Sequence, residues 1–151
     1  MKVRQVAGVV LYDKDLNLVF QVRGNANKVG ELYSFFGGSV KPGETPKQAV
    51  LRELSEEITY KPKKLKYMGK FEYVIEEEYP WKGTKIIQHV YISPATNELL
   101  QSEVHEGDGM IVISLEEAIK GDGFPKKSTR FLKKIKKELT SIVKKQKNRN
   151  S

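Results

Sequence analysis

The most constraining feature of this chain is a charged helix that follows a glycine-containing loop, in the stretch GGSVKPGETPKQAVLRELSEEITY. Thr45 can cap the first free N–H groups of a helix, Pro46 suits the first helical position, and Gln48 completes a capping box. The sequence therefore predicts a helix from Pro46 to about Ile58, with apolar side chains on one broad side at positions 50, 51, 54 and 58.

Three glutamates crowd one face of this helix. Glu53 lies three residues before Glu56 and four before Glu57, and like charges at these spacings weaken a helix. Either nearby lysines and Arg52 offset the repulsion, or a divalent cation does. The preceding loop favours the cation, because glycine lets backbone groups approach a ligand closely and hard cations prefer carboxylate and carbonyl oxygens. The alternative is an acidic face that meets only solvent.

The spacing of these residues resembles a known family. Gly38, five residues, Glu44, seven residues and then the run RELSEE are similar to the box that defines Nudix hydrolases. The resemblance implies a mixed β-sheet sandwiched between α-helices, an α/β or mixed α+β fold, over about residues 3–139. Thr59 and Tyr60 depart from the box, which usually ends in glycine and an aliphatic residue. We expect this departure to change the helix exit rather than the activity.

The resemblance also implies an activity and a metal site. Nudix enzymes hydrolyse a nucleoside diphosphate linked to another group, and they use Mg²⁺ or Mn²⁺. By resemblance, the main metal ligands are Glu56 and Glu57, and the carbonyl of Gly37 or Gly38 joins them. Glu53 would bind the metal, directly or through water, or take a proton from the attacking water.

Further catalytic candidates follow from the same resemblance. Arg52 would orient a glutamate through an ion pair, and Glu44 would hold a ligand in place or merely complement the helix dipole. Some members, such as the MutT type, take another carboxylate from a late loop. In the loop VHEGDG, Glu106 is the candidate general base or extra ligand, with Glu103 and Asp108 as rivals. The alternative is an ordinary polar turn.

Four residues are candidates for substrate binding. Arg23 and Lys85 could meet phosphates, whereas Phe35 and Trp81 could lie against a base. The alternatives are a strand-end arginine, a core phenylalanine and an aromatic cap on a hairpin. MutT-like proteins read oxidised guanine with an asparagine in a late Phe-Pro segment. The stretch FPKKS at residues 124–128 lacks it, which weakens a role in removing oxidised nucleotides.

Periodic patterns place the other elements. Apolar or alternating runs predict strands at residues 6–11, 18–22, 32–36, 66–75, 85–92 and 110–113. Ser114 and Glu117 predict a short capped helix to residue 119, and a last helix begins near Ser128.

Length and composition indicate one domain. The 151 residues are 38% hydrophobic, enough for a single core, and we assign a domain to residues 1–143 and a basic flexible tail to residues 144–151. The chain has no cysteine, as is common in reducing compartments, and its N-terminal apolar run is soon broken by charge. We therefore expect a cytoplasmic protein without membrane contact. Family members are often dimers, but no sequence pattern decides the oligomeric state.

The positive charge is concentrated near the C-terminus. The net charge is +8, and residues 126–149 hold eleven Lys or Arg and one acidic residue, against 16 basic and 18 acidic residues elsewhere. Apolar residues there recur at helical spacing. The segment is predicted to be an amphipathic helix whose lysine-rich face either meets only solvent or contacts RNA or another anionic surface.

Three functions compete. The first is hydrolysis of a small nucleotide, such as a (d)NTP, and the complete acidic set favours it. The second is a Nudix-type module that binds nucleotide or RNA without turnover. The third is a pyrophosphohydrolase of RNA 5′ ends, in which the basic helix holds the strand.

Overall fold

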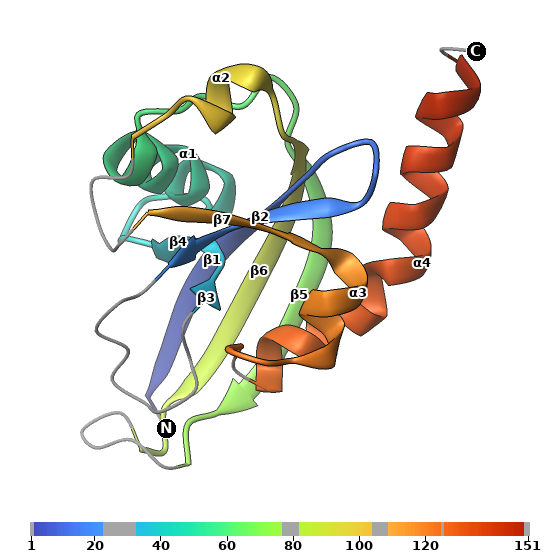
Figure 1. Cartoon of the computed structure of the whole chain (residues 1–151). Helices are drawn as coiled ribbons and strands as arrows, with labels where there is room; N and C mark the ends of the chain where they lie inside the picture. Colours follow the sequence, from blue (N-terminus) through green and yellow to red (C-terminus); the bar gives the residue numbers. More distant parts are fainter. Residues whose placement is uncertain (1, 23–32, 77–81, 104–108, 125, 150–151) are drawn as a thin grey trace.

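The computed structural model describes residues 2–22, 33–76, 82–103, 109–124 and 126–149, without the side chains of residues 126–128 and 149. These residues form seven strands and four helices (Figure 1). The elements are β1 (Val3–Tyr12), β2 (Asn17–Val22), β3 (Tyr33–Ser34), β4 (Phe36–Ser39), α1 (Pro46–Ile58), β5 (Lys66–Val74), β6 (Lys85–Pro94), α2 (Asn97–Leu100), β7 (Met110–Ser114), α3 (Leu115–Lys120) and α4 (Lys126–Arg149).

Strand β1 is the centre of a mixed sheet with the order β3-β2-β1-β6-β5. One side of β1 pairs in parallel with the whole of β6, from Val3 opposite Lys85 to Tyr12 opposite Pro94. The other side pairs antiparallel with β4 and, further along, with β2. Strand β7 pairs with β2, and β5 forms the edge beyond β6. The alternation of side chains along β1 therefore gives each face of the sheet its own set of apolar residues.

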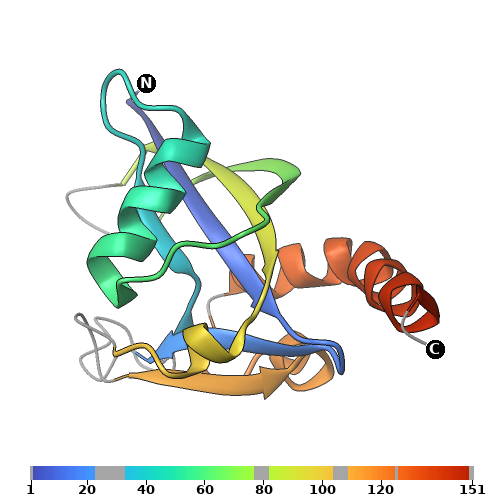
Figure 2. The same ribbon diagram turned by 90° about the horizontal axis from the view of Figure 1, so that it is seen from above.

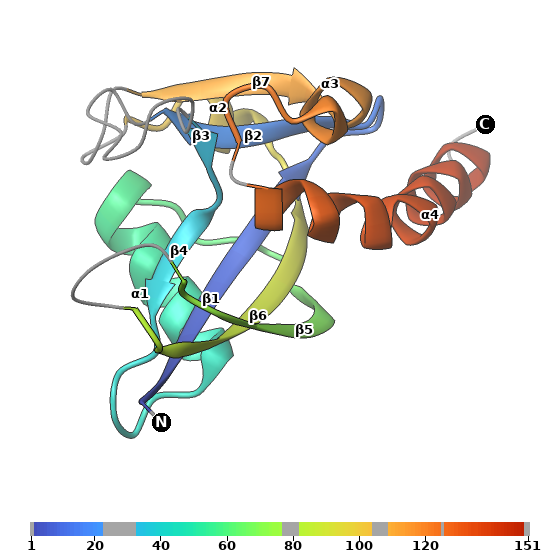
Figure 3. The ribbon, with the colours of Figure 1, turned by 90° about the horizontal axis from the view of Figure 1, so that it is seen from below.

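Helices cover both faces of the sheet (Figures 2 and 3). On one face α1 packs over Ala7, Val9 and Leu11 of β1 through its own buried Val50 and Leu54. On the other face α3 and α4 pack over a second core. That core holds Val10, Tyr12, Phe20, Val90, Ile92, Phe131, Leu132, Ile135 and Leu139. The predicted mixed sheet between helices is confirmed.

Local sequence signals place two helices correctly. The Thr45 side chain accepts a hydrogen bond from the Gln48 N–H while the Gln48 side chain bonds back to Thr45, so the capping box starts α1 at Pro46 as predicted. Ser114 likewise caps α3 by accepting from the Glu117 N–H. The strands also match, although β1 is longer than predicted and the segment around Phe35 is divided between β3 and β4.

Helix α4 differs most from its prediction. It begins at Lys126, two residues earlier than expected, and continues to Arg149, so residues 144–149 form helix where we predicted a flexible tail. Ile142 and the buried Val143 pack on the core, and Lys147 Nζ lies 3.6 Å from Asp15 Oδ1, which explains why the helix extends this far. No helix in the described residues is long and apolar enough to cross a membrane.

The residue that caps the C-terminal end of α1 is unusual, whereas its backbone conformation is a common one for a helix cap. Thr59 caps the helix with φ 48° and ψ 48°, the left-handed conformation that glycine adopts without strain and that costs other residues about 1–2 kcal/mol. Its neighbour Tyr60 is buried in the core on the α1 side. The change of helix exit that we expected is therefore not seen in the backbone: threonine adopts the cap conformation that glycine favours.

Replacing this threonine should stabilise the protein. We expect Thr59→Gly to raise the free energy of unfolding by about 0.5–1 kcal/mol, because relief of the left-handed strain exceeds the entropic penalty of glycine. Urea unfolding followed by circular dichroism measures it. Thr59→Ala is the matched control: it keeps the Cβ atom and should give no gain. Equal stabilisation by both variants would contradict the explanation by strain.

Candidate active site

Two glycines bring strand β4 into close contact with its neighbours. At Gly37, with φ 148°, an added Cβ atom would clash with the carbonyl oxygen of Ala7 on β1. At Gly38, an added Cβ atom would lie 2.5 Å from Glu53 Oε1. A side chain at position 37 would force the backbones of β4 and β1 apart, whereas one at position 38 would displace the Glu53 carboxylate. Glycine at position 38 is therefore what lets this carboxylate lie directly against β4.

Glu57 is fixed beside the same strand. Glu57 is only 3% exposed, although it carries a carboxylate. Its Oε1 atom accepts a hydrogen bond of 3.0 Å from the Gly37 N–H. A buried carboxylate needs such partners to offset its desolvation. The register of α1 against β4 thus places an acidic oxygen next to the glycine pair.

The Arg52 guanidinium is the centre of the acidic cluster. Its Nε and Nη2 atoms bind both carboxylate oxygens of Glu44, at 2.8 and 3.0 Å. Its Nη1 atom lies 2.8 Å from Glu53 Oε1 and 3.4 Å from Glu56 Oε2, and Nη2 also donates to the Ser39 carbonyl at 2.9 Å. One cation therefore offsets the repulsion that the sequence predicted among these acids.

This pairing shifts the titration of Glu44. The hydrogen bond from Arg52 and the second from the Lys41 N–H lower the pKa of Glu44 from 4.5 to about 2. The hydrogen bond to Glu44, and secondarily the one to Glu53, raise the pKa of Arg52 above its usual range. Both groups stay charged at neutral pH, so Glu44 anchors Arg52, which in turn holds Glu53.

The structure brings some of the other predicted residues to defined places. Phe35 packs with its ring centroid 5.7 Å from Phe20 and 6.4 Å from Phe131, on the α4 side of the sheet. Lys85 Nζ lies 2.9 Å from Glu72 Oε2, so a carboxylate already engages its charge. Glu103 is exposed. The predicted residues Arg23, Trp81, Glu106 and Asp108 lie outside the described part of the chain.

Sequence reasoning missed the aromatic neighbours of Phe35. Phe71 of β5 stacks on Phe131 of α4 with ring centroids 5.1 Å apart. Gly8 of β1 lies opposite Gly37. Because Gly8 has no side chain, the side chains of Phe35 and Gln88 can lie over it: a Cβ atom added to Gly8 would be 3.2 Å from Gln88 Nε2. The alternating pattern of β5 could have predicted the face on which Phe71 lies, but only tertiary structure brings these residues together.

His89 belongs to a separate hydrogen-bonded group. Its Nε2 atom lies 2.8 Å from Gln5 Oε1 and its Nδ1 atom 3.0 Å from the Tyr67 hydroxyl. Burial, and secondarily the charge of Lys70, lower the pKa of His89. The parallel register sets His89 opposite Ala7, on the α1 face of the sheet.

Comparison with known proteins identifies the family. A model described as the NUDIX domain matches residues 2–136. The chain belongs to this family. A CTP pyrophosphohydrolase of Escherichia coli is 29% identical over 119 residues, which cover 79% of this chain and 82% of that protein. An 8-oxo-dGTP diphosphatase of the same organism is 33% identical over 73 residues, 48% of this chain and 57% of the relative.

Solved structures agree on the Nudix fold. A MutT protein from Methanosarcina mazei superposes with a TM-score of 0.73 at 18% identity, covering 91% of this chain and 95% of the other. The Escherichia coli ORF135 protein gives a TM-score of 0.68 at 23% identity, with 88% of each chain covered. The prediction of a Nudix pyrophosphohydrolase, a hydrolase of phosphoric anhydride bonds, is confirmed at the level of the family.

Nudix hydrolases generally use divalent metal ions, and the donor chemistry of this site fits one. Glu53, Glu56, Glu57 and the glycine backbone supply only oxygen donors, the set that Mg²⁺ and Mn²⁺ prefer. Within the described residues no three acidic or histidine side chains converge closely enough to hold an ion, because Glu53 and Glu56 turn toward Arg52 and Glu57 toward Gly37. The Glu56 side chain is half-exposed, and its contact with Arg52 is the longest that Arg52 makes in this cluster, at 3.4 Å.

The ion pair between Glu44 and Arg52 predicts a pH dependence of stability. The pKa of Glu44 is lowered from 4.5 to about 2 by folding, so its stabilising contribution is complete above pH 4.5 and disappears as the pH falls toward 2. We expect Glu44→Gln to unfold at lower urea concentration than the parent at neutral pH. The difference should narrow steadily below about pH 4.5 in a series of urea titrations.

A double-mutant cycle provides the control. In an Arg52→Gln background, Glu44→Gln should have a much smaller effect, because the main partner that lowers the pKa of Glu44 is gone and only the Lys41 N–H remains. A stability difference that stayed constant down to pH 3, or one that was undiminished in the Arg52→Gln background, would contradict the assignment.

Proposed function

We propose that this Nudix protein is a divalent-metal-dependent pyrophosphohydrolase of nucleoside triphosphates. The observation that carries the proposal is the cluster around Arg52, which gathers Glu53 and Glu56 beside the Gly37 contact of Glu57. An acidic cluster held at the junction of a glycine-containing strand and a helix suits a cation that binds phosphates.

The relatives support a triphosphate and favour CTP as the first substrate to test. The CTP pyrophosphohydrolase aligns along most of both chains, whereas the diphosphatase of oxidised dGTP aligns with only about half of this chain. The late segment FPKKS also lacks the asparagine with which MutT-like proteins read oxidised guanine. For these two reasons we rank oxidised nucleotides second.

The acidic residues have distinct roles in this proposal. Glu56 and Glu57, with the carbonyl of Gly37 or Gly38, would hold Mg²⁺ or Mn²⁺, and Glu53 would complete the set. The bound cation supplies charge neutralisation of the phosphates and activation of water. Arg52 positions Glu53 through its 2.8 Å contact, and Glu44 fixes the orientation of Arg52.

The proposed reaction breaks one phosphoanhydride bond. The oxygen of a water molecule bonds to one phosphorus atom while the bond from that phosphorus to the bridging oxygen breaks, giving a nucleoside monophosphate and pyrophosphate. The water proton passes to a carboxylate, either Glu53 or Glu106 of the late loop. Positioning and charge stabilisation provide most of the rate enhancement in phosphoryl transfer.

The base would lie against the aromatic residues beside the glycine strand. Phe35 precedes Gly37 by two residues, and it packs with Phe131, which itself stacks on Phe71. The Gln88 side chain next to Phe35 and Gly8 offers both a donor and an acceptor for a base edge. Since Lys85 already binds Glu72, Arg23 is the stronger candidate for a phosphate contact.

Release of phosphate and pyrophosphate tests the proposal. The panel contains normal and oxidised nucleoside triphosphates, nucleotide sugars, ADP-ribose, dinucleoside polyphosphates and 5′-triphosphate RNA, each with Mg²⁺ and Mn²⁺. We expect release of pyrophosphate from a nucleoside triphosphate. Glu57→Gln should lower this activity by at least about a hundredfold, the usual effect of removing one group that stabilises transition-state charge.

Glu116→Gln is the matched control, because Glu116 is an exposed acid in the first turn of α3, and it should leave activity unchanged. The rise in melting temperature on adding Mg²⁺ gives a second readout, which Glu57→Gln should reduce. Full activity in Glu57→Gln would overturn the assignment of the ligands. No hydrolysis across the panel, with the Mg²⁺ effect intact, would favour a non-catalytic binding module.

A further inference from the structure

The outer face of α4 carries a row of cations. Seven basic side chains on it are exposed: Arg130, Lys133, Lys134, Lys136, Lys137, Lys144 and Lys145. Within the described residues none of these seven forms an ion pair. The acid of this helix, Glu138, binds Lys66 of β5 at 3.2 Å. From Arg130 to Lys144 the row extends about 21 Å along the helix axis.

A second basic segment lies beside this helix. The residues leading into β5 have the sequence KPKKLK, and Lys61, Lys63, Lys64 and Lys66 of this segment are exposed. The ion pair between Lys66 and Glu138 joins the segment to one flank of α4. Lys145 lies on the same flank, because it is seven residues, or two helical turns, beyond Glu138. The fold therefore brings together two positively charged segments that are far apart in sequence.

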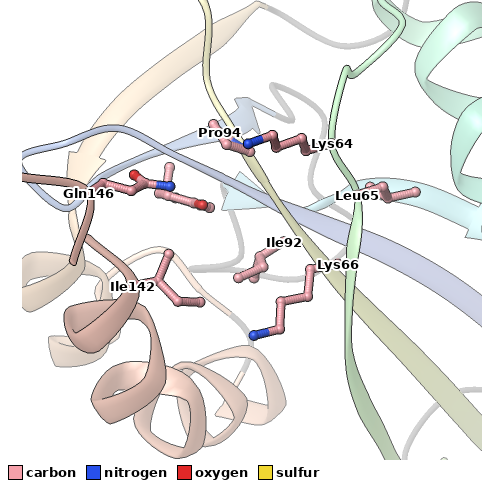
Figure 4. Close-up of a pocket in the computed structure, with 8 residues that line it drawn as sticks. Lys64, Leu65, Lys66, Ile92, Pro94, Ile142 and Gln146 are labelled. Atoms are coloured by element: carbon pink, nitrogen blue, oxygen red, sulfur yellow. The ribbon is translucent and has the colours of Figure 1, made fainter. Parts of the chain in front are cut away.

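Between the two segments lies a groove of about 250 Å³. Lys64 and Lys66 form one lip, and their side chains extend toward α4, where Ile142 and Gln146 form the other lip (Figure 4). The apolar Ile92 and Pro94 of β6 line the groove between the lips, as do Leu65 and the buried Tyr12. This lining combines an apolar floor with one cationic edge, on the β5 side, and we call it the lysine groove.

The shape and charge of this surface fit a single-stranded polyanion. A small anion would contact only one or two of the cations, whereas a polymer can follow the whole row. The groove is smaller than sites that enclose a complete small-molecule ligand, but it can take an unstacked base or a ribose. The bases of a duplex are stacked within the double helix, so they could not contact the apolar floor of the groove.

A membrane surface fits less well. Helices that bind membranes insert an apolar face between the lipids. The apolar face of α4 is already occupied by the core through Leu132, Ile135 and Leu139, and its outer face presents lysines together with Thr140 and Ser141.

We propose that the outer face of α4 and the lysine groove together form a binding surface for single-stranded nucleic acid. The cations contact the phosphate backbone, and the groove holds one nucleoside unit. The surface lies across the sheet from α1 (Figure 3), so it is separate from the acidic cluster.

Fluorescence anisotropy with labelled RNA and DNA oligonucleotides of one sequence tests the proposal on the full chain. The outer-face variant replaces Lys133, Lys137 and Lys144 by Gln. Each lost phosphate contact should weaken binding about fivefold at 0.1 M salt, so this variant should bind about a hundredfold more weakly. Its plot of log affinity against log salt should be flatter by about two units. Lys64→Gln with Lys145→Gln should weaken binding by a further factor that is independent of the first.

The matched control removes the same charge elsewhere. Lys2, Lys47 and Lys82 are exposed lysines away from this surface, and their replacement by Gln should change affinity less than about threefold. Nucleotide hydrolysis and melting temperature should be unchanged in all variants. Tighter binding of RNA than of DNA would identify RNA as the preferred strand.

Three results would overturn the proposal. The first is an affinity and a salt dependence that the outer-face variant leaves unchanged. The second is an equal loss in the control variant, which would show an effect of net charge alone. The third is tighter binding to vesicles that contain phosphatidylserine than to either oligonucleotide, with the same lysines responsible.

Discussion

A single guanidinium group, that of Arg52, joins three parts of the chain that must meet for the acidic cluster to exist. It binds Glu44 from the loop, Glu53 and Glu56 from its own helix, and the Ser39 carbonyl at the end of β4. Lysine could not replace it, because an ammonium group lacks the planar fork that serves several oxygens at once. The repulsion along α1 is thus offset by the same contacts that hold the loop and the strand in place.

Local signals explain why α1 and α3 could be predicted to within a residue. The capping pairs of Thr45 with Gln48 and of Ser114 with Glu117 lie within one turn of sequence and require no tertiary contact. The short helix α2 was not predicted, although Thr96 caps it by accepting from the Leu99 N–H. Four residues are too few to show a helical period.

The acidic residues could also be found from sequence, because a fixed spacing on one helix determines which side chains share a face. The residues that surround them in the folded chain could not be predicted from the sequence. The contact of Glu57 with Gly37 depends on how α1 packs against β4, and the stack of Phe71 on Phe131 joins a strand to a distant helix. The extent of α4 was underestimated for the same reason: Lys147 reaches Asp15 only in the folded chain.

The position of β1 has a consequence for how the chain can fold as it is synthesised. This strand pairs with β4 at residues 36–39 and, along its whole length, with β6 at residues 85–94. Its apolar run from Val6 to Leu11 is therefore synthesised long before its parallel partner β6, which begins at Lys85. Pairings so distant in sequence slow folding and leave strand edges open to wrong partners. The early pairing with β4 covers one edge of β1 during that interval.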